Sequence, residues 1–479
     1  MRHVRDRWNL VYAIVVLQGL ASAVPWNVFV TESQYLALRV HRPPYRNVVA
    51  DNFENMNMIV SQVGTLLGFL FYVPCQRWMS INVQVLYPNI VTLVAMVLAA
   101  WITMSTWMSG NAFAVITLLS QALIGVTTAM ITGGVFVMSA WLPSAYVQGM
   151  SLGMGLAGTV VSAISFVTCW LWPAGASHTK TVDEAAPEAL SYFVISSVII
   201  AAAIVTYDIF FRQPFVKQHL QPEVLLEWIS PACADQHVKV LTALRDCGLS
   251  SSAGHSPSDA EQPLLCAASR IERKEQADMP DELSLKQIMQ RMMGYNTVAF
   301  LNQFVTTAAF PGLTSAICSQ WNHAHVAPCH SDTKMGRLSG DLFVPLMFLA
   351  FNGGDVLGRL GAGLEPWRSR APAMSFLVSY QALRGVLLLG LVLCHVVTPS
   401  PWQLPHLLRS DLWPLGLTIA LGLTNGHGQS MAMMHAPSTL PGGFTRDRCG
   451  PILNLAFTVG CMLGSCAAFG ITYYFQAGA

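Results

Sequence analysis

Residues 341–363 read DLFVPLMFLAFNGGDVLGRLGAG and are apolar over most of their length. A helix needs roughly 20 residues to cross a hydrocarbon core of about 30 Å, so this stretch predicts a membrane-spanning helix. Ten similar segments occupy most of the remaining chain: about 8–31, 56–74, 81–106, 112–140, 146–172, 189–211, 291–319, 371–397, 411–435 and 450–475. The sequence therefore predicts an all-α polytopic membrane protein with about 11 transmembrane helices.

The overall composition agrees with a membrane-embedded chain. Of the 479 residues, 53% are hydrophobic and 11% are charged, and the mean hydropathy is +0.47. Average soluble domains carry about 25% charged residues. The formal net charge of +1 offers no basic surplus to neutralise nucleic-acid phosphates. The composition excludes an ordinary cytosolic enzyme and a nucleic-acid-binding protein, and it predicts that the lipid bilayer surrounds the chain.

The chain divides into three predicted parts. Charged residues are concentrated between residues 212 and 290, where the polar stretch SSSAGHSPS (250–258) also lies. Such a composition cannot bury enough apolar surface to fold alone, so it predicts a partly disordered cytosolic linker. The linker separates an N-terminal bundle of six helices (1–211) from a C-terminal bundle of five (291–479), which gives a 6+5 arrangement.

The residues before the first span set the expected orientation. Arg2, Arg5 and Arg7 precede it, so the positive-inside rule predicts a cytosolic N-terminus. With 11 spans, the C-terminus then lies outside. The first span lacks a small-residue cleavage site, so we expect it to be a retained helix and not a signal peptide.

The sequence gives no support for cofactor chemistry. Its 11 cysteines lack the spacing of a metal site, and no Walker A, HExxH or GxSxG sequence occurs. We therefore expect no cofactor, no metal and no catalytic residue. Cys318 and Cys329 fall at the same predicted end of one helix and its following loop, where a disulfide can form in an oxidising compartment.

Asp355 and Arg359 are the exceptional residues of the segment 341–363, because ionisable side chains inside a span are costly. They lie four residues apart, so one helical turn puts both on one face, and Asn352 shares that face. The pair can be structural, since removing one partner of a buried ion pair costs ~3–5 kcal/mol. Alternatively, it faces a water-filled path and binds or gates a polar solute, and the flanking glycines favour this second interpretation.

Other polar or small residues interrupt apolar segments. Trp26 and Asn27 follow Pro25, which removes a backbone hydrogen bond. An indole face can stack on a flat heterocycle and an amide can bond to its edge, although Trp26 also fits an interfacial aromatic belt. Arg384 lies near the middle of the segment 371–397, where we expect it to anchor a charge network.

These motifs, in this order, resemble the equilibrative nucleoside transporter family (solute carrier family 29). The most specific is the pattern Phe-Asn-x-x-Asp-x-x-Gly-Arg of the eighth helix, found here from Phe351 to Arg359. The family topology of 11 helices, with a cytosolic N-terminus and a large loop after the sixth, also matches. The further matching motifs are Pro25-Trp26-Asn27, Leu142-Pro143 with Tyr146, Leu156-Ala157-Gly158, Phe310-Pro311 and Asn425-Gly426.

The resemblance implies a major-facilitator-like carrier that moves nucleosides, and in some members nucleobases, by alternating access without enzymatic activity. By position, Asp355 and Arg359 would engage ribose hydroxyls or control their access, and Trp26 and Asn27 would line the cavity. Thr132 is shorter than the Gln of better-known members, which would enlarge the base slot. The other matched residues would contact solute (Asn352, Asn425) or serve packing and gating (Gly153, Gly158, Phe310, Pro311, with Arg384).

Two alternatives share these features. Some family members couple transport to protons, for which Asp355 or His427 would be the candidates. The sequence from Asp355 to Arg359 also resembles a loop motif of major-facilitator carriers of sugars or drugs, but no copy follows the second helix. The family default predicts the plasma membrane, with an organelle membrane as the alternative. No pattern specifies an oligomeric state.

Overall fold

The computed structural model describes most of the chain. It covers residues 5–40, 53–105, 108–171, 182–220, 283–321, 336–394, 407–441 and 444–476, which are called the described residues below. Every long element within them is an α-helix, as the sequence predicts.

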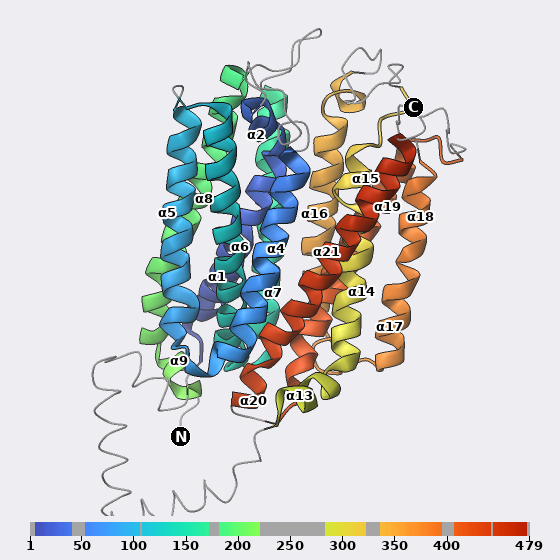
Figure 1. Ribbon diagram of the computed structural model, residues 1–479. Helices are drawn as coiled ribbons and strands as arrows, with labels where there is room; N and C mark the ends of the chain where they lie inside the picture. Colours follow the sequence, from blue (N-terminus) through green and yellow to red (C-terminus); the bar gives the residue numbers. More distant parts are fainter. Residues whose placement is uncertain are drawn as a thin grey trace, which may run out of the picture.

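The N-terminal half forms one group of helices, on the left in Figure 1. Two short helices, α2 (Ser33–Val40) and α9 (Pro214–His219), lie at its opposite ends. The long helices are α1 (Leu10–Thr31), α4 (Phe53–Cys75), α5 (Tyr87–Met104), α6 (Gly110–Ala140), α7 (Ser144–Leu171) and α8 (Val182–Arg212).

The C-terminal half forms a second group, on the right in Figure 1. Its short helices are α13 (Leu285–Arg291), α15 (Gly312–Ser315) and α20 (Phe444–Asp447). Its longer helices are α14 (Met293–Ala309), α16 (Phe343–Ala362), α17 (Met374–Leu383), α18 (Gly385–Val392), α19 (Leu412–His435) and α21 (Cys449–Gln476).

The helices follow the predicted segments. Each of the 11 segments contains one helix or two consecutive helices. α1 begins at the opposite end of the molecule from the end that α21 reaches (Figure 1), as an odd number of crossings requires. Among the described residues, 7 helices are long and apolar enough to cross a membrane. The chain is thus a multi-pass membrane protein, and the exact number of crossings stays a prediction.

Two of the predicted segments contain interrupted helices. Between α14 and α15, Phe310 has an extended backbone and its peptide bond to Pro311 is cis. The Phe310 ring stacks on that of Phe351 in α16, with ring centroids 4.0 Å apart. In the segment 371–397, α17 ends and α18 begins at Arg384.

The two bundles meet chiefly along α7 and α16. α7 packs against α16 and α19, and α21 packs against α4 and α6. The closest pairs within the bundles, α1 with α7 and α16 with α19, depend on glycines. A Cβ at Gly153 would overlap the carbonyl of Val16, and one at Gly358 would overlap the carbonyl of Leu423. Because these Cβ atoms are missing, the helix backbones touch.

Most of the predicted linker at 212–290 lies outside the described residues, so its disorder stays a prediction. At its end α13 begins with a capping box, in which Ser284 and Gln287 exchange hydrogen bonds. Cys318 is disulfide-bonded. Its predicted partner Cys329 lies outside the described residues.

The contact between α1 and α7 should not tolerate a side chain at Gly153. We expect Gly153→Val to force the two backbones apart and to lower the free energy of unfolding by ~1–3 kcal/mol. Gly353 of α16 has nothing within 4 Å of the position of a Cβ, so Gly353→Ala is the control and should be neutral or slightly stabilising. The amount and melting temperature of detergent-solubilised chain measure both; equal losses would contradict the close packing at Gly153.

Candidate functional site

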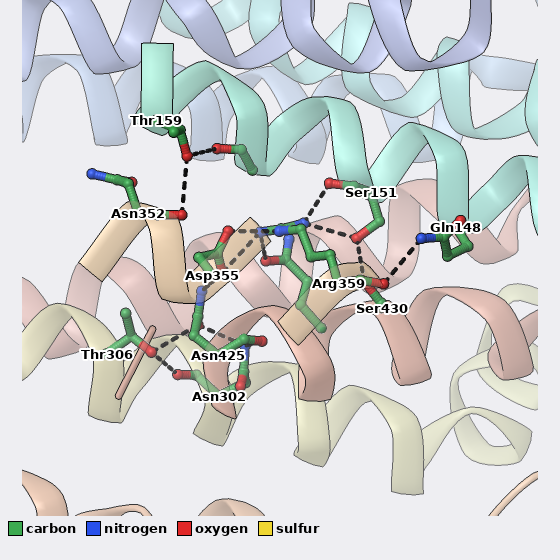
Figure 2. Close-up of polar contacts among 12 residues, drawn as sticks. Gln148, Ser151, Thr159, Asn302, Thr306, Asn352, Asp355, Arg359, Asn425 and Ser430 are labelled. Carbon is green, nitrogen blue, oxygen red and sulfur yellow. Dashed lines mark hydrogen bonds and ion pairs between the residues drawn. The ribbon is translucent and has the colours of Figure 1, made fainter. Parts of the chain in front are cut away.

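Asp355 and Arg359 form an ion pair in the interior of α16. Arg359 Nε donates to Asp355 Oδ2 over 2.6 Å, and each side chain is 5% exposed. Figure 2 shows the pair between α7 on one side and the helices of the C-terminal bundle on the other. The prediction that the two residues share one face of the helix is confirmed.

The other donors of Arg359 reach both bundles. Its Nη1 donates to the carbonyl oxygen (2.7 Å) and the hydroxyl (2.8 Å) of Ser151 in α7. Its Nη2 donates to Gln429 Oε1 in α19 over 2.7 Å. The hydroxyls of Ser151 and Ser430 lie 2.7 Å apart. One planar guanidinium group, whose donors point in fixed directions, therefore joins the N-terminal bundle to the C-terminal bundle.

Asn425 of α19 holds the second carboxylate oxygen of Asp355. Its Nδ2 donates to Asp355 Oδ1 over 2.7 Å. Its amide oxygen accepts bonds from Asn302 Nδ2 (3.0 Å) and Thr306 Oγ1 (2.8 Å), both in α14. Because two donors occupy the amide oxygen, the amide nitrogen faces the carboxylate. These bonds from α14 thus set the orientation of Asn425, which in turn holds Asp355.

Arg384 completes this arrangement from the break between α17 and α18, where it is 2% exposed. Its Nη1 donates to Asn302 Oδ1 over 2.5 Å, its Nη2 to Thr306 Oγ1 over 2.7 Å and its Nε to Thr424 Oγ1 over 3.0 Å. These acceptors are neutral oxygens whose dipoles stabilise the buried charge. The term "polar network" below means Asn302, Thr306, Asp355, Arg359, Arg384 and Asn425.

The polar network offers a carboxylate acceptor, guanidinium donors and an amide, which suit a solute with several hydroxyl groups. In the described part of the chain, no group of three or more His, Cys, Asp or Glu side chains is arranged to hold a metal ion. The network is closed: a Cβ added at Gly155 of α7 would lie 2.6 Å from Arg359 Cδ. A solute can therefore reach Arg359 from this side only when α7 separates from α16.

Asn352 continues the contact between the bundles along α16. Its Nδ2 donates to Ser162 Oγ over 2.7 Å, and its backbone carbonyl accepts from Thr159 Oγ1 over 3.0 Å. A Cβ at Gly158 would overlap the side-chain oxygen of Asn352 and would lie 3.3 Å from Asn27 Oδ1. Gly158 therefore lets Asn27 of α1 and Asn352 of α16 approach the same point.

Some residues predicted from the sequence lie apart from the polar network. Trp26 is half-buried in α1 and Thr132 is buried in α6. No side-chain hydrogen bond between described residues joins either of them to the network. His427 makes T-shaped contacts with the Trp367 and Tyr380 rings, whose centroids lie 5.2 and 5.9 Å from its own. His427 is therefore a packing residue in this structure.

The α7 residues that contact Arg359 and Asn352 are not among the residues that the sequence predicts for the site. They form one stripe with a spacing of three or four residues, which brings them to the face of α7 that meets α16. A 3.6-residue period of polar and small residues within an apolar helix is the signal that identifies them. The stripe consists of Gln148, Ser151, Gly155, Thr159 and Ser162.

A second contact joins α7 and α16 near the end of the molecule that α21 reaches. Arg337, which precedes α16, pairs with Asp341 over 2.8 Å. Its guanidinium also donates to the backbone carbonyls of Trp170 (2.7 Å) and Cys169 (2.5 Å) at the C-terminal end of α7, where carbonyls lack partners within the helix. The bond to Asp341 raises the pKa of Arg337 above its usual value. The bundles are thus held together at this end too.

Comparisons with known proteins bear on what this site does. The family model described as nucleoside transporter matches residues 118–473. The chain is 23% identical to equilibrative nucleoside transporter 3 of Rattus norvegicus, over 98% of this chain and 90% of that protein. It is 25% identical to equilibrative nucleoside transporter 2 of Homo sapiens, over 97% of each.

Among solved structures, the fold is similar to that of XylE, a proton:xylose symporter of the major facilitator superfamily, bound to 6-bromo-6-deoxy-D-glucose. The TM-score is 0.57 at 9% identity, over 98% of this chain and 91% of that chain. At this identity the likeness concerns the fold alone. It confirms the predicted major-facilitator-like arrangement.

The buried ion pair should matter far more for stability than an exposed pair of the same spacing. We expect Asp355→Asn to lower the free energy of unfolding by ~3–5 kcal/mol, because Arg359 then keeps a buried charge without its carboxylate. Asp208 and Arg212 in α8 are the matched pair, four residues apart and 2.6 Å from each other, with side chains 50% and 68% exposed. Asp208→Asn should cost less than ~1 kcal/mol.

Thermal unfolding compares the two costs. It is measured on the solubilised wild-type chain and both variants, with size-exclusion chromatography as the readout of folded chain. A similar fall in melting temperature for both variants would contradict the special cost assigned to Asp355.

Proposed function

The chain belongs to the nucleoside transporter family, and from this premise we propose that it carries nucleosides across a membrane by alternating access and facilitated diffusion. It is a carrier and not an enzyme. The major-facilitator-like fold supports this proposal, because in such carriers solute binds between two bundles that rock against each other.

The position of the polar network is the observation that carries the proposal. Ionisable residues within membrane-spanning helices mark solute paths by default. Here Arg359 bonds at once to α7 of one bundle and to α16 and α19 of the other. A solute that binds at this point would contact both bundles and would therefore be sensitive to their separation.

The hydrogen bonds suggest how a nucleoside is held. When α7 moves away from α16, Arg359 Nη1 loses the two oxygen atoms of Ser151. Ribose hydroxyls would take their place, accepting from Arg359 and donating to the carboxylate of Asp355. Asn425 keeps its bonds to α14 within the same bundle, so Asp355 stays oriented for the incoming hydroxyls, which lowers the cost of binding.

We assign the base to the side of the network nearest α1. Asn27 and Asn352 approach the same point at Gly158 there, and their amides can both donate to and accept from a base edge. Trp26 is the neighbour of Asn27 in α1 and would offer a flat surface. Thr132 would line the slot from α6, where its short side chain leaves room.

Residues 1–211 and 291–479 would act as two halves that move against each other, joined by the linker 212–290. The arginines before α1 support a cytosolic N-terminus, with the C-terminus outside. We propose the plasma membrane as the location.

Uptake of radiolabelled adenosine and uridine into transport-deficient cells tests the function. We expect saturable uptake that Asp355→Ala and Arg359→Ala each reduce by about 10-fold or more, since hydrogen bonds to charged groups contribute ~1.5–3 kcal/mol. Asp208→Ala in the exposed pair of α8 is the control and should retain uptake. Each variant is compared at equal amounts in the membrane.

Three outcomes would change the proposal. Absence of nucleoside uptake by a correctly inserted wild-type chain would contradict it. Normal uptake by both variants would make the ion pair structural. Accumulation above the outside concentration that depends on a proton gradient would replace facilitated diffusion with proton-coupled symport.

Alternating access also predicts that Arg337 keeps one end of the carrier closed. We expect Arg337→Ala to increase severalfold the labelling of the Cys169 thiol by a membrane-impermeant reagent, because α7 loses its bonds to the other bundle at that end. Cys75 lies at the end of α4, near the opposite end of the molecule, so its labelling is the internal control and should not rise. Unchanged labelling of Cys169 would show that Arg337 does not close this end.

A further inference from the structure

A cavity of about 390 Å³ lies between the two bundles, near the end of the molecule where α1 begins. Small-molecule sites typically measure ~300–1,000 Å³. From the N-terminal bundle it is lined by side chains that include Tyr12, Tyr146 and Gln148, and from the C-terminal bundle by Leu360, Leu364 and Arg368. It belongs to the same contact between α7 and α16 as the polar network, but it lies beyond the last bond of that network.

Gln148 separates the cavity from Arg359. Its Nε2 donates to the backbone carbonyl of Arg359 over 3.0 Å, and its Oε1 accepts from the Tyr12 hydroxyl over 2.9 Å. Figure 2 places Gln148 at one end of the drawn chain of bonds. Gln148 also lines the cavity and is 6% exposed. Gln148 therefore borders both the cavity and the backbone of Arg359, and once α7 separates from α16 it can change position by rotating about its own bonds.

The lining of the cavity suits a neutral, flat solute with hydroxyl groups. Tyr12 and Tyr146 offer ring surfaces, and the hydroxyl oxygen of each keeps a lone pair after donating its proton to Gln148 or Asp6. Leu360 and Leu364 supply an apolar wall. Arg368 is the charged residue of the lining, and Glu365 already pairs with it over 3.1 Å, so a charged solute gains no unpaired partner there.

We propose that this cavity is a second nucleoside-binding site, occupied on the way between the polar network and the face where α1 begins, with Gln148 at the boundary between the two sites. The inference rests on the proposed function, which supplies the solute. It adds a binding site distinct from Asp355 and Arg359. A solute leaving the polar network would move past Gln148 and bind next among the tyrosines.

Protection of an introduced cysteine tests the second site. Leu364 is 66% exposed and lines the cavity, so a membrane-impermeant thiol reagent should modify Leu364→Cys in permeabilised cells, above the background of the native cysteines. Adenosine at four times its dissociation constant should slow this modification about fivefold, because only one-fifth of the sites remain empty. Arg370→Cys, in the same connecting segment between α16 and α17 but outside the lining, is the matched control and should show no protection.

The same measurement in an Asp355→Asn background separates the two sites. Persistent protection at position 364 would support an independent site. Loss of protection in that background, with equal amounts of chain in the membrane, would overturn it by showing that the effect originates at the polar network. Absence of protection in a chain that takes up adenosine would also overturn it and leave the proposed function standing. If Leu364→Cys fails to fold, Leu360→Cys, 44% exposed in the same wall, replaces it.

Discussion

A guanidinium group has five N–H donors and keeps its charge under all ordinary conditions, so its burial requires an oxygen atom for each direction in which it donates. This requirement organises the centre of the molecule. Arg359 finds its oxygens on α16, α7 and α19, and Arg384 finds oxygens on α14 and α19. The helices that supply these atoms have to approach closely and stay in register.

Close approach is provided by glycines placed along the same helices. A Cβ at Gly354, Gly358, Gly422 or Gly426 would meet backbone atoms across the contact between α16 and α19. Because the backbones lie this close, the side chains of Asp355 and Arg359 bond directly to those of Asn425 and Gln429. Satisfied in this way, the charges stabilise one arrangement of the helices. In a carrier such an arrangement must also come apart. A state in which solute reaches the polar network would break the bonds between α7 and α16.

The sequence predicts the helices well and the site in part, for physical reasons that differ. Apolar runs long enough to cross a bilayer identify the segments, because lipid tolerates few other patterns. Asp355 and Arg359 stand out because charge is costly there. Ser151, Thr306 and Gln429 do not, since a hydroxyl or amide within a span is common and costs little by itself. The breaks at Pro311 and Arg384 were also not predicted as helix ends, because the apolar run continues through both.

The contact of Arg337 with α7 is made entirely to main-chain carbonyls, those of Cys169 and Trp170. Any residue presents a carbonyl, so this contact places no demand on which side chains stand at 169 and 170, whereas it needs a forked donor at 337. The two sides of the contact are therefore unequally constrained. The two bonds survive a change of side chain at 169 or 170 but not the loss of Arg337, although the Cys169 thiol adds a contact of its own to the carbonyl of Asp341, 3.8 Å away.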